Sequence, residues 1–430
     1  MKKLLLPGIL ALLVPSLGAF AQTPEPEATP TPVKLVVTNN LPPPTRITQP
    51  SPTPIIVGSS RPRIVEDDPV TSGQGPSPAP TFKPMVLPNE FKTMSFGQIK
   101  GRIAEAKRLM QSRPVQTASE DPQLVNSLVR IAFYDWKTQR VDFVVMNKDS
   151  FLDIKEDTQT VSSSGKPISV HTIRANGVNT PVILTDKDGQ AQLPLMVQYP
   201  VERNGKFYET AYYMSTHPGL VNPEVISAGQ YYVHNVVEIA RDRLTAKGIA
   251  IQPKVADIAE RLATVEHVDH TRFRTEPTQN IFNDIFTLYA LNEGQTYRYS
   301  VSSAGAGGMV QMIPSTYQMI RSRYPSVGLM PDFVEGMRNH VNATQAMLLY
   351  MQMTWNDMRS SQTIVDAMTG GLATQEQLMA AGYNSNPAKI PGYISRGGSG
   401  WTGLIPRETK IYLQIYDSLE RYVPMTSRTR

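Results

Sequence analysis

From residue 222 almost to the end of the chain, apolar residues recur three and four positions apart, which is the spacing of one face of an α-helix. The pattern runs through five segments: NPEVISAGQYYVHNVVEIARDRL, VADIAERLATVEHV, TQNIFNDIFTLYALNEG, NATQAMLLYMQMTWNDM and ETKIYLQIYDSLERYV. Pro223 occupies the first helical position of the first segment, a site where proline is favoured. The pattern predicts a mostly helical domain over residues 222–430.

The preceding residues follow another pattern. Ser95 and Gln98 form a capping-box signature ahead of apolar residues at helical spacing, so we expect a helix to begin there. Between about 120 and 220, β-branched and aromatic runs alternate with turn residues, and Asn204-Gly205 is a two-residue hairpin signal. Residues 96–221 are therefore expected to form a helix plus a β-rich module. The predicted fold class is α+β, and the pattern does not indicate what the module does.

The first 95 residues differ again. Two lysines, an apolar stretch and Ala19-Phe20-Ala21 have the form of a secretory signal peptide over residues 1–21. Residues 22–95 are rich in Pro, Ser and Thr and carry 17 of the 36 prolines, which predicts a disordered linker. These features predict export to the periplasm, with full secretion as the alternative.

Composition limits the chemistry. The chain has no cysteine, so it has neither a disulfide nor a thiolate metal site. His267 and His270 enclose one possible ligand, Asp269, but this short group lacks a confirming further set of ligands, and we predict no metal and no cofactor. The net charge of +5 includes two leader lysines and is too small to indicate a nucleic-acid partner. No later stretch approaches roughly 18 apolar residues, so we do not expect an integral membrane protein.

One carboxylate has a position suited to catalysis. Glu293 ends the apolar stripe of Ile281, Phe282, Ile285 and Leu288 and precedes Gly294, a natural helix stop. The helix dipole and partial burial would both raise the pKa of a carboxyl group there, as a general acid requires. The following AGAGG run would let a bulky polymer approach the backbone, and Gln311 offers a donor and an acceptor to sugar hydroxyls or N-acetyl groups.

Three blocks of sequence resemble the soluble lytic transglycosylase domain, a family related to goose-type lysozyme. They are Glu293 with VSSAGAGGMVQMIP, then MAAGYNSNP, then LIPRETKIYL. The resemblance covers residues 278–422. It implies a lysozyme-like helical fold, Glu293 as catalyst, no metal or cofactor, and peptidoglycan as partner. It also implies the following substrate-binding residues: Gln311, Tyr383, Asn384, Ser302 and Met309. The chain departs from the family pattern at Gly294, where a serine is usual, and at Asn386.

The resemblance implies a mechanism with one carboxylate. Glu293 would protonate the oxygen between N-acetylmuramic acid and N-acetylglucosamine and then deprotonate the muramic 6-hydroxyl, which closes a 1,6-anhydro ring. Two alternatives stay open: a lysozyme-like hydrolase on the same scaffold, and a non-catalytic wall-binding protein whose β-rich module recruits a wall-spanning or division assembly. Glu408 is expected to cap the final helix.

Overall fold

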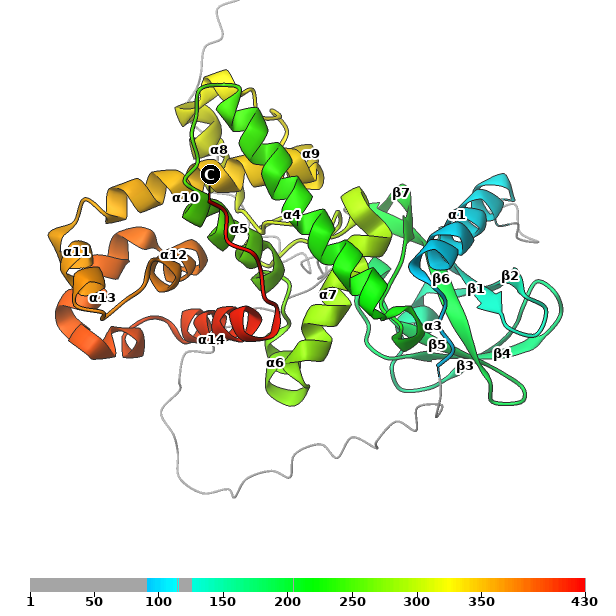
Figure 1. Ribbon diagram of the computed structural model, residues 1–430. Coiled ribbons are helices and arrows are strands. Elements are labelled where there is room, and N and C mark those ends of the chain that lie inside the picture. The colour runs from blue at the N-terminus through cyan, green and yellow to red at the C-terminus, as the bar shows by residue number, and fades with distance from the viewer. Residues whose placement is uncertain (1–90, 114, 116–125, 204, 430) are drawn as a thin grey trace, which may run out of the picture. The chain divides into compact units, whose positions relative to one another are not determined.

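The structure is a computed structural model that describes residues 91–113, 115, 126–203 and 205–429 (Figure 1). The expected signal peptide and residues 22–90 of the expected linker lie outside these ranges. The helices are α1 (Phe96–Ser112), α3 (Lys148–Leu152), α4 (Pro223–Thr245), α5 (Pro253–Val265), α6 (His270–Thr275), α7 (Thr278–Asn292), α8 (Pro314–Arg323), α9 (Phe333–Arg338), α10 (His340–Met358), α11 (Gln362–Thr369), α12 (Gln375–Asn384), α13 (Ile390–Gly397) and α14 (Arg407–Tyr422). The strands are β1 (Leu128–Asp135), β2 (Arg140–Asn147), β3 (Thr158–Val161), β4 (Pro167–Thr172), β5 (Val182–Asp186), β6 (Ala191–Arg203) and β7 (Lys206–Tyr213). The α+β class is confirmed.

The strands form one antiparallel sheet in the order β2-β1-β6-β5-β4-β3, and β7 pairs with β6. The long strand β6 pairs with β1, β5 and β7. The sheet curls so that its two ends approach each other. Just after β3, the Ser163 N–H donates to the Phe143 carbonyl of β2 at 2.8 Å. The predicted hairpin is confirmed: Arg203 pairs with Lys206, and Gly205 has a φ of 70°.

Helix α1 covers part of this sheet. The predicted capping box is present, since the Ser95 side chain accepts from the Gln98 N–H and the Gln98 side chain accepts from the Ser95 N–H. The buried face of α1 includes Ile99 and Ile103, which belong to one apolar cluster with Leu195 of β6. Burial of these side chains holds α1 to the sheet, because burying each large aliphatic side chain stabilises the fold by about 1.5–3 kcal/mol.

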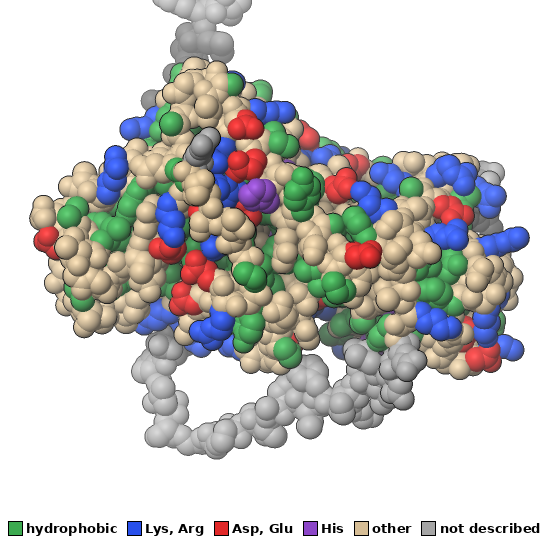
Figure 2. Space-filling model, in the orientation of Figure 1, with side chains coloured by type: hydrophobic (Ala, Val, Ile, Leu, Met, Phe, Trp, Pro, Cys, Tyr) green, Lys and Arg blue, Asp and Glu red, His purple; other side chains and the backbone are tan. Residues whose placement is uncertain are grey.

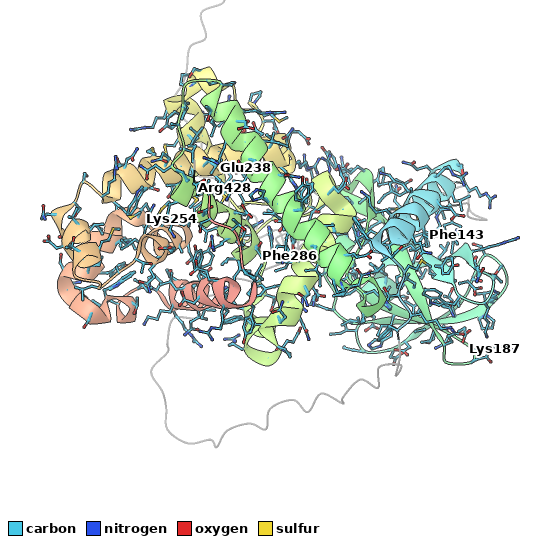
Figure 3. All side chains as sticks on the ribbon, viewed as in Figure 1. Phe143, Lys187, Glu238, Lys254, Phe286 and Arg428 are labelled. Carbon is cyan, nitrogen blue, oxygen red and sulfur yellow. The ribbon has the colours of Figure 1, made fainter. Side chains whose placement is uncertain are left out.

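In the helical part, α4 and α7 pack closely together. A Cβ placed on Gly229 of α4 would lie 1.9 Å from the carbonyl oxygen of Phe286 in α7, so only glycine permits this approach. Figure 3 labels Phe286 on α7. The start of α4 follows the prediction, with Asn222 as N-cap and Pro223 at the first helical position.

The β-rich and helical parts share their apolar core. One cluster joins Val197 and Tyr213 of the sheet to Phe282 of α7. A second cluster joins α1 and the sheet to Ala290 of α7, three residues before Glu293, and Leu291 packs against it. The end of α7 is therefore positioned by the sheet and α1 as well as by the neighbouring helices.

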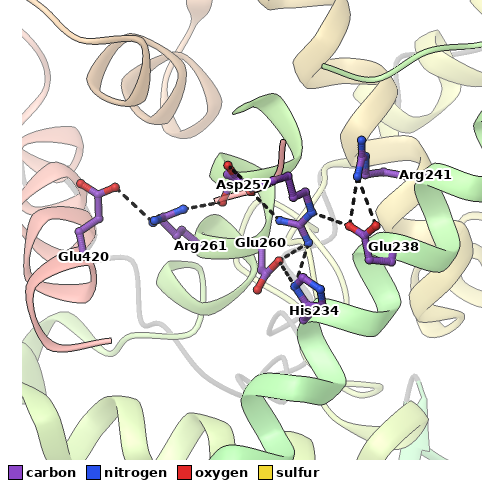
Figure 4. A network of polar contacts seen from close by, with 8 residues as sticks. His234, Glu238, Arg241, Asp257, Glu260, Arg261 and Glu420 are labelled. Carbon is purple, nitrogen blue, oxygen red and sulfur yellow. Dashed lines mark hydrogen bonds and ion pairs between the residues drawn. The ribbon is translucent and has the colours of Figure 1, made fainter. Parts of the chain in front are cut away.

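The C-terminal tail is anchored by one side chain. Arg428, whose side chain is 6% exposed, donates from Nε to Glu238 of α4 at 2.5 Å and from Nη1 to Asp257 of α5 at 2.8 Å. Its Nη2 bonds the buried Glu260. Figure 3 shows Arg428 beside Glu238, and Figure 4 shows the surrounding network. The tail is thus attached to α4 and α5 by contacts between one guanidinium and three carboxylates.

The visible surface carries both signs of charge. Figure 2 shows acidic and basic side chains interspersed across this face, without a large region of one sign. Within the described ranges, no helix is both long and apolar enough to cross a membrane.

Candidate active site

Glu293 lies where the sequence placed it, at the end of α7. The predicted stripe is buried, with Ile281 and Ile285 at 1% and 3% exposure. The helix ends at Asn292, and the Glu293 N–H donates to the Tyr289 carbonyl. The Asn292 side chain bonds both the N–H and the carbonyl of Met214 just after β7, at 2.8 and 2.9 Å. These bonds tie the helix end to the sheet.

The expected burial of Glu293 is wrong. Its side chain is 54% exposed, and Oε1 accepts a hydrogen bond from Nζ of Lys100 at 2.5 Å. Lys100 belongs to α1, 193 residues earlier in the chain. Because α1 packs on the sheet beside the end of α7, the Lys100 ammonium reaches the Glu293 carboxylate. The contact is between two exposed groups, so it contributes little to stability.

The backbone around Glu293 is strained. The described chain has four non-glycine residues with positive φ: Gln139, Glu293, Tyr297 and Gln311. Three of them fall in the segment from Glu293 to Gln311, with φ between 46° and 56°. Residues other than glycine rarely adopt a positive φ. Those that do gather at functional sites, where surrounding contacts hold them in place. This segment is therefore a functional-site candidate on backbone geometry as well as on sequence.

The AGAGG run forms a compact loop. The Ser302 N–H donates to the Ala306 carbonyl at 2.8 Å, and the Ser302 hydroxyl accepts from the Ala306 N–H at 3.0 Å. Gly308 has a φ of 66°, and a Cβ there would lie 2.3 Å from the carbonyl oxygen of Met337. The small size of Gly308 is thus required by contact with α9 of the same chain. That the rest of the run admits a polymer stays a prediction.

Gln311 and Met309 both face inward. The Gln311 side chain donates from Nε2 to the Ser300 hydroxyl at 3.1 Å and to the Gly308 carbonyl at 2.8 Å, and the residue is 6% exposed. In this structure Nε2 is engaged within the protein, and the assignment of Gln311 to sugar binding stays a prediction. Met309 is fully buried.

The three sequence blocks meet in the structure. Tyr383 of α12 donates its hydroxyl to the Val310 carbonyl at 2.7 Å, which joins the second block to the first. Asn384 accepts from the Thr409 hydroxyl of α14 at 2.8 Å, which joins the second block to the third. Burial, followed by the charge of Glu266, raises the pKa of Tyr383. Its hydroxyl is therefore a neutral donor to the first block.

The tyrosine whose ionisation responds to Glu293 is Tyr232. Burial, and after it the charge of Glu293, raises the pKa of Tyr232. A Cβ on Gly294 would lie 3.8 Å from the Tyr232 hydroxyl. For Tyr383 the carboxylate with that effect is Glu266. The sequence did not indicate Tyr232, because helical spacing does not show which helix faces the end of α7.

Two buried histidines support the strained segment. His267 stacks on Tyr297 with ring centres 3.4 Å apart, and its Nε2 bonds the Met309 carbonyl at 2.8 Å. His340 bonds the Thr296 carbonyl through Nε2 at 2.7 Å. A carbonyl only accepts, so Nε2 of each ring carries the proton. Among the described residues no cluster of three potential metal ligands occurs.

His340 also links the segment to α4. With its proton on Nε2, its Nδ1 accepts from the Tyr232 hydroxyl at 2.9 Å. Burial lowers the pKa of His340 to about 4. A chain of hydrogen bonds thus runs from Tyr232, beside Gly294, through a neutral imidazole to the Thr296 backbone.

We expect this histidine to make the fold sensitive to acid. The pKa of a histidine is near 6.5 in the unfolded chain, and that of His340 is about 4 in the folded protein. The contribution of neutral His340 to stability is therefore present above pH 6.5 and is lost as the pH falls toward 4. Between pH 7 and pH 5 it should lower the free energy of unfolding by about 2 kcal/mol. Urea titrations of wild type and His340→Gln at both pH values measure this. The variant should lose about 2 kcal/mol less than wild type over that interval, and equal losses would contradict the assignment.

Two clefts lie in the β-rich part. One, of about 800 Å³, is bordered by α3 and the β6–β7 hairpin, and the other, of about 620 Å³, lies between α1 and the β1–β2 hairpin. Glu293 lines neither of them. Comparison of the chain with protein-family models, curated protein sequences and solved structures gives no match.

Proposed function

We propose that the protein is a peptidoglycan lytic transglycosylase in which Glu293 is the acid and base. The observation that carries the proposal is the meeting of three separated motif blocks, through Tyr383 with Val310 and Asn384 with Thr409. These contacts lie in the same helical part as a helix-end glutamate with a φ of 46°. A chance match of short motifs has no reason to bring all three blocks into contact.

The proposed reaction uses one carboxyl group twice. Glu293 donates its proton to the glycosidic oxygen as the bond from C1 of N-acetylmuramic acid breaks. The 6-hydroxyl of the same sugar attacks C1, and the Glu293 carboxylate takes its proton. Glu293 ends in its starting state, and no water is consumed. In this structure the Lys100 ammonium contacts Oε1 of Glu293 at 2.5 Å.

The product identifies the reaction. Purified sacculi digested with the wild-type protein should release muropeptides that end in 1,6-anhydro-N-acetylmuramic acid. Hydrolysis would instead leave reducing N-acetylmuramic acid, which is 18 mass units heavier because one water has been added. Mass spectrometry of the soluble fraction distinguishes these results. Reducing ends would replace the proposal with the hydrolase alternative.

One observation favours a non-catalytic alternative. An exposed carboxylate paired with an ammonium is a common surface arrangement, and Glu293 and Lys100 are about half exposed. If the wild type releases no soluble muropeptide but still sediments with sacculi, the protein is a wall-binding component, and the proposed catalysis is wrong. Partners such as a wall-spanning assembly then become the main question for the β-rich part.

A further inference from the structure

The cleft between α1 and the β1–β2 hairpin has a chemistry that the proposed reaction does not use. Its volume is about 620 Å³, within the range of small-molecule sites. Gln98, Gly101 and Arg102 border it from α1, and Tyr134, Trp136 and Gln139 border it from the hairpin. The cleft thus combines two aromatic rings with planar polar side chains.

The hairpin tip that carries Trp136 is held rigidly. Asp135, 3% exposed, accepts from the Lys137 N–H at 2.8 Å and the Thr138 N–H at 3.2 Å. The buried Gln192 accepts from the Trp136 N–H at 3.1 Å. Gln139 completes the turn with a φ of 57°. Buried polar groups and a strained residue are costly, and here they fix the backbone on both sides of one large aromatic side chain.

The aromatic rings are oriented by their neighbours. Tyr134 and Trp136 meet edge to face, with centres 5.0 Å apart at 84°. The guanidinium of Arg102 lies 5.0 Å from the Tyr134 ring centre. Lys92 lies 6.0 Å from the Trp136 ring centre, at the outer limit of a cation–π contact, so it is weakly held and displaceable.

The polar side chains of the cleft give it little net charge. Arg102 donates to Glu105 at 2.8 Å, so its charge is balanced within the cleft. Gln139 adds a neutral amide, and Gln98 adds amide N–H donors, because its carbonyl oxygen accepts from Ser95 in the capping box. Such a lining offers donors and acceptors to hydroxyl and acetamido groups, and it lacks the cluster of cations that an anion requires.

Gly101 leaves open space on the α1 side of the cleft. It lies inside α1, where glycine destabilises a helix by about 1 kcal/mol relative to alanine. A Cβ at this position would meet nothing within 4 Å, so packing does not require glycine there. This open space, in the same cleft as the fixed tryptophan, would admit a flat ring that stacks on the aromatic face.

We propose that this cleft binds a neutral sugar ring of a glycan chain, with Trp136 as the stacking platform and Gln98, Gln139, Arg102 and Glu105 as hydrogen-bonding partners. The site is separate from Glu293 and does not depend on catalysis. On the proposed function, it would hold the enzyme on its polymer.

Tryptophan fluorescence reports directly on sugar binding in this cleft. The chain has three, and Trp355 and Trp401 are buried at 5% and 1% exposure, whereas Trp136 is partly exposed. Titration of the full-length Glu293→Gln protein with tetra-N-acetylchitotetraose should shift the emission to shorter wavelength and protect it from acrylamide quenching. A saturable change of this kind supports the proposal. Absence of both changes at millimolar sugar overturns it.

Two matched substitutions locate the site by isothermal titration calorimetry. Gly101→Leu places a side chain in the open space on the α1 side of the cleft and should weaken binding at least about tenfold, while the helix becomes more stable. Gly97→Leu makes the same change in α1 at a glycine that also has open space around it but lies outside the cleft, and binding should be unchanged. Equal affinity in the two variants would overturn the proposal.

Trp136→Ala should also weaken binding at least about tenfold. Lys137→Ala, at the same hairpin tip but paired with Asp186 and Asp188, should not. A proline-rich peptide of residues 76–84 is titrated in parallel. If that peptide binds through Trp136 and the sugar does not, the cleft is a peptide site and the proposal fails. The Glu293→Gln background keeps this outcome independent of whether the protein cleaves peptidoglycan.

Discussion

Glu293→Gln should lower the rate of 1,6-anhydro muropeptide release at least about 10³-fold, the largest effect on activity that we expect. Glutamine has nearly the same shape but neither donates a proton to the leaving oxygen nor accepts one from the 6-hydroxyl. General acid and base catalysis each contribute roughly 10²–10⁴-fold. One residue supplies both in the proposed reaction, so no second carboxyl group remains to compensate. Release from sacculi, followed by mass spectrometry over time, measures the loss.

The control for this variant is stability. Glu293 is 54% exposed and pairs with the exposed Lys100, so losing the ion pair should change the free energy of unfolding by less than about 1 kcal/mol. Glu408→Gln, in the first turn of α14, makes the same chemical change away from Glu293 and should keep the wild-type rate. If the two variants release product at equal rates, Glu293 is not the catalyst.

Arg428→Ala should lower the free energy of unfolding by about 3–5 kcal/mol, although the residue is third from the C-terminus of the sequence. Removing the guanidinium leaves Asp257 and Glu260, 4% and 3% exposed, close together without their cation. The main cost is the burial of unpaired negative charge, which exceeds the loss of any single hydrogen bond. Urea denaturation at pH 7 measures the change.

Two further variants test the origin of this loss. Arg421→Ala removes an exposed arginine at the end of α14 and should cost less than about 0.5 kcal/mol. Adding Glu260→Gln to Arg428→Ala removes one of the unpaired charges and should recover part of the lost stability. A double variant less stable than Arg428→Ala would show that unpaired charge is not the cause.

Local features were predictable because they depend on neighbouring residues. The Ser95–Gln98 capping box, the hairpin at Gly205 and the helix end before Glu293 all follow from short-range geometry. The α+β arrangement followed from the change in apolar spacing near residue 222. Each of these signals lies within a few turns of helix or one pair of strands.

The surroundings of Glu293 were not predictable in this way. Lys100 reaches the carboxylate only because α1 packs on the sheet beside α7, and nothing near either residue indicates the pairing. Gln311 is 6% exposed and has a φ of 46°, and its residue type indicates neither. The Tyr232–His340 contact joins α4 and α10 through two residues that are 108 positions apart in the chain. Tertiary packing decides these details, and one sequence contains no direct record of it.

The apolar core that joins the sheet to Ala290 has a practical consequence for dissecting the protein. A fragment that starts at Asn222 would lose α1 and the strands and would expose to water the side of α7 that lies just before Glu293. Such a fragment should aggregate or leave the helix end frayed. The smallest portable unit with an intact Glu293 therefore starts near Phe91, and the β-rich part belongs to it as scaffold.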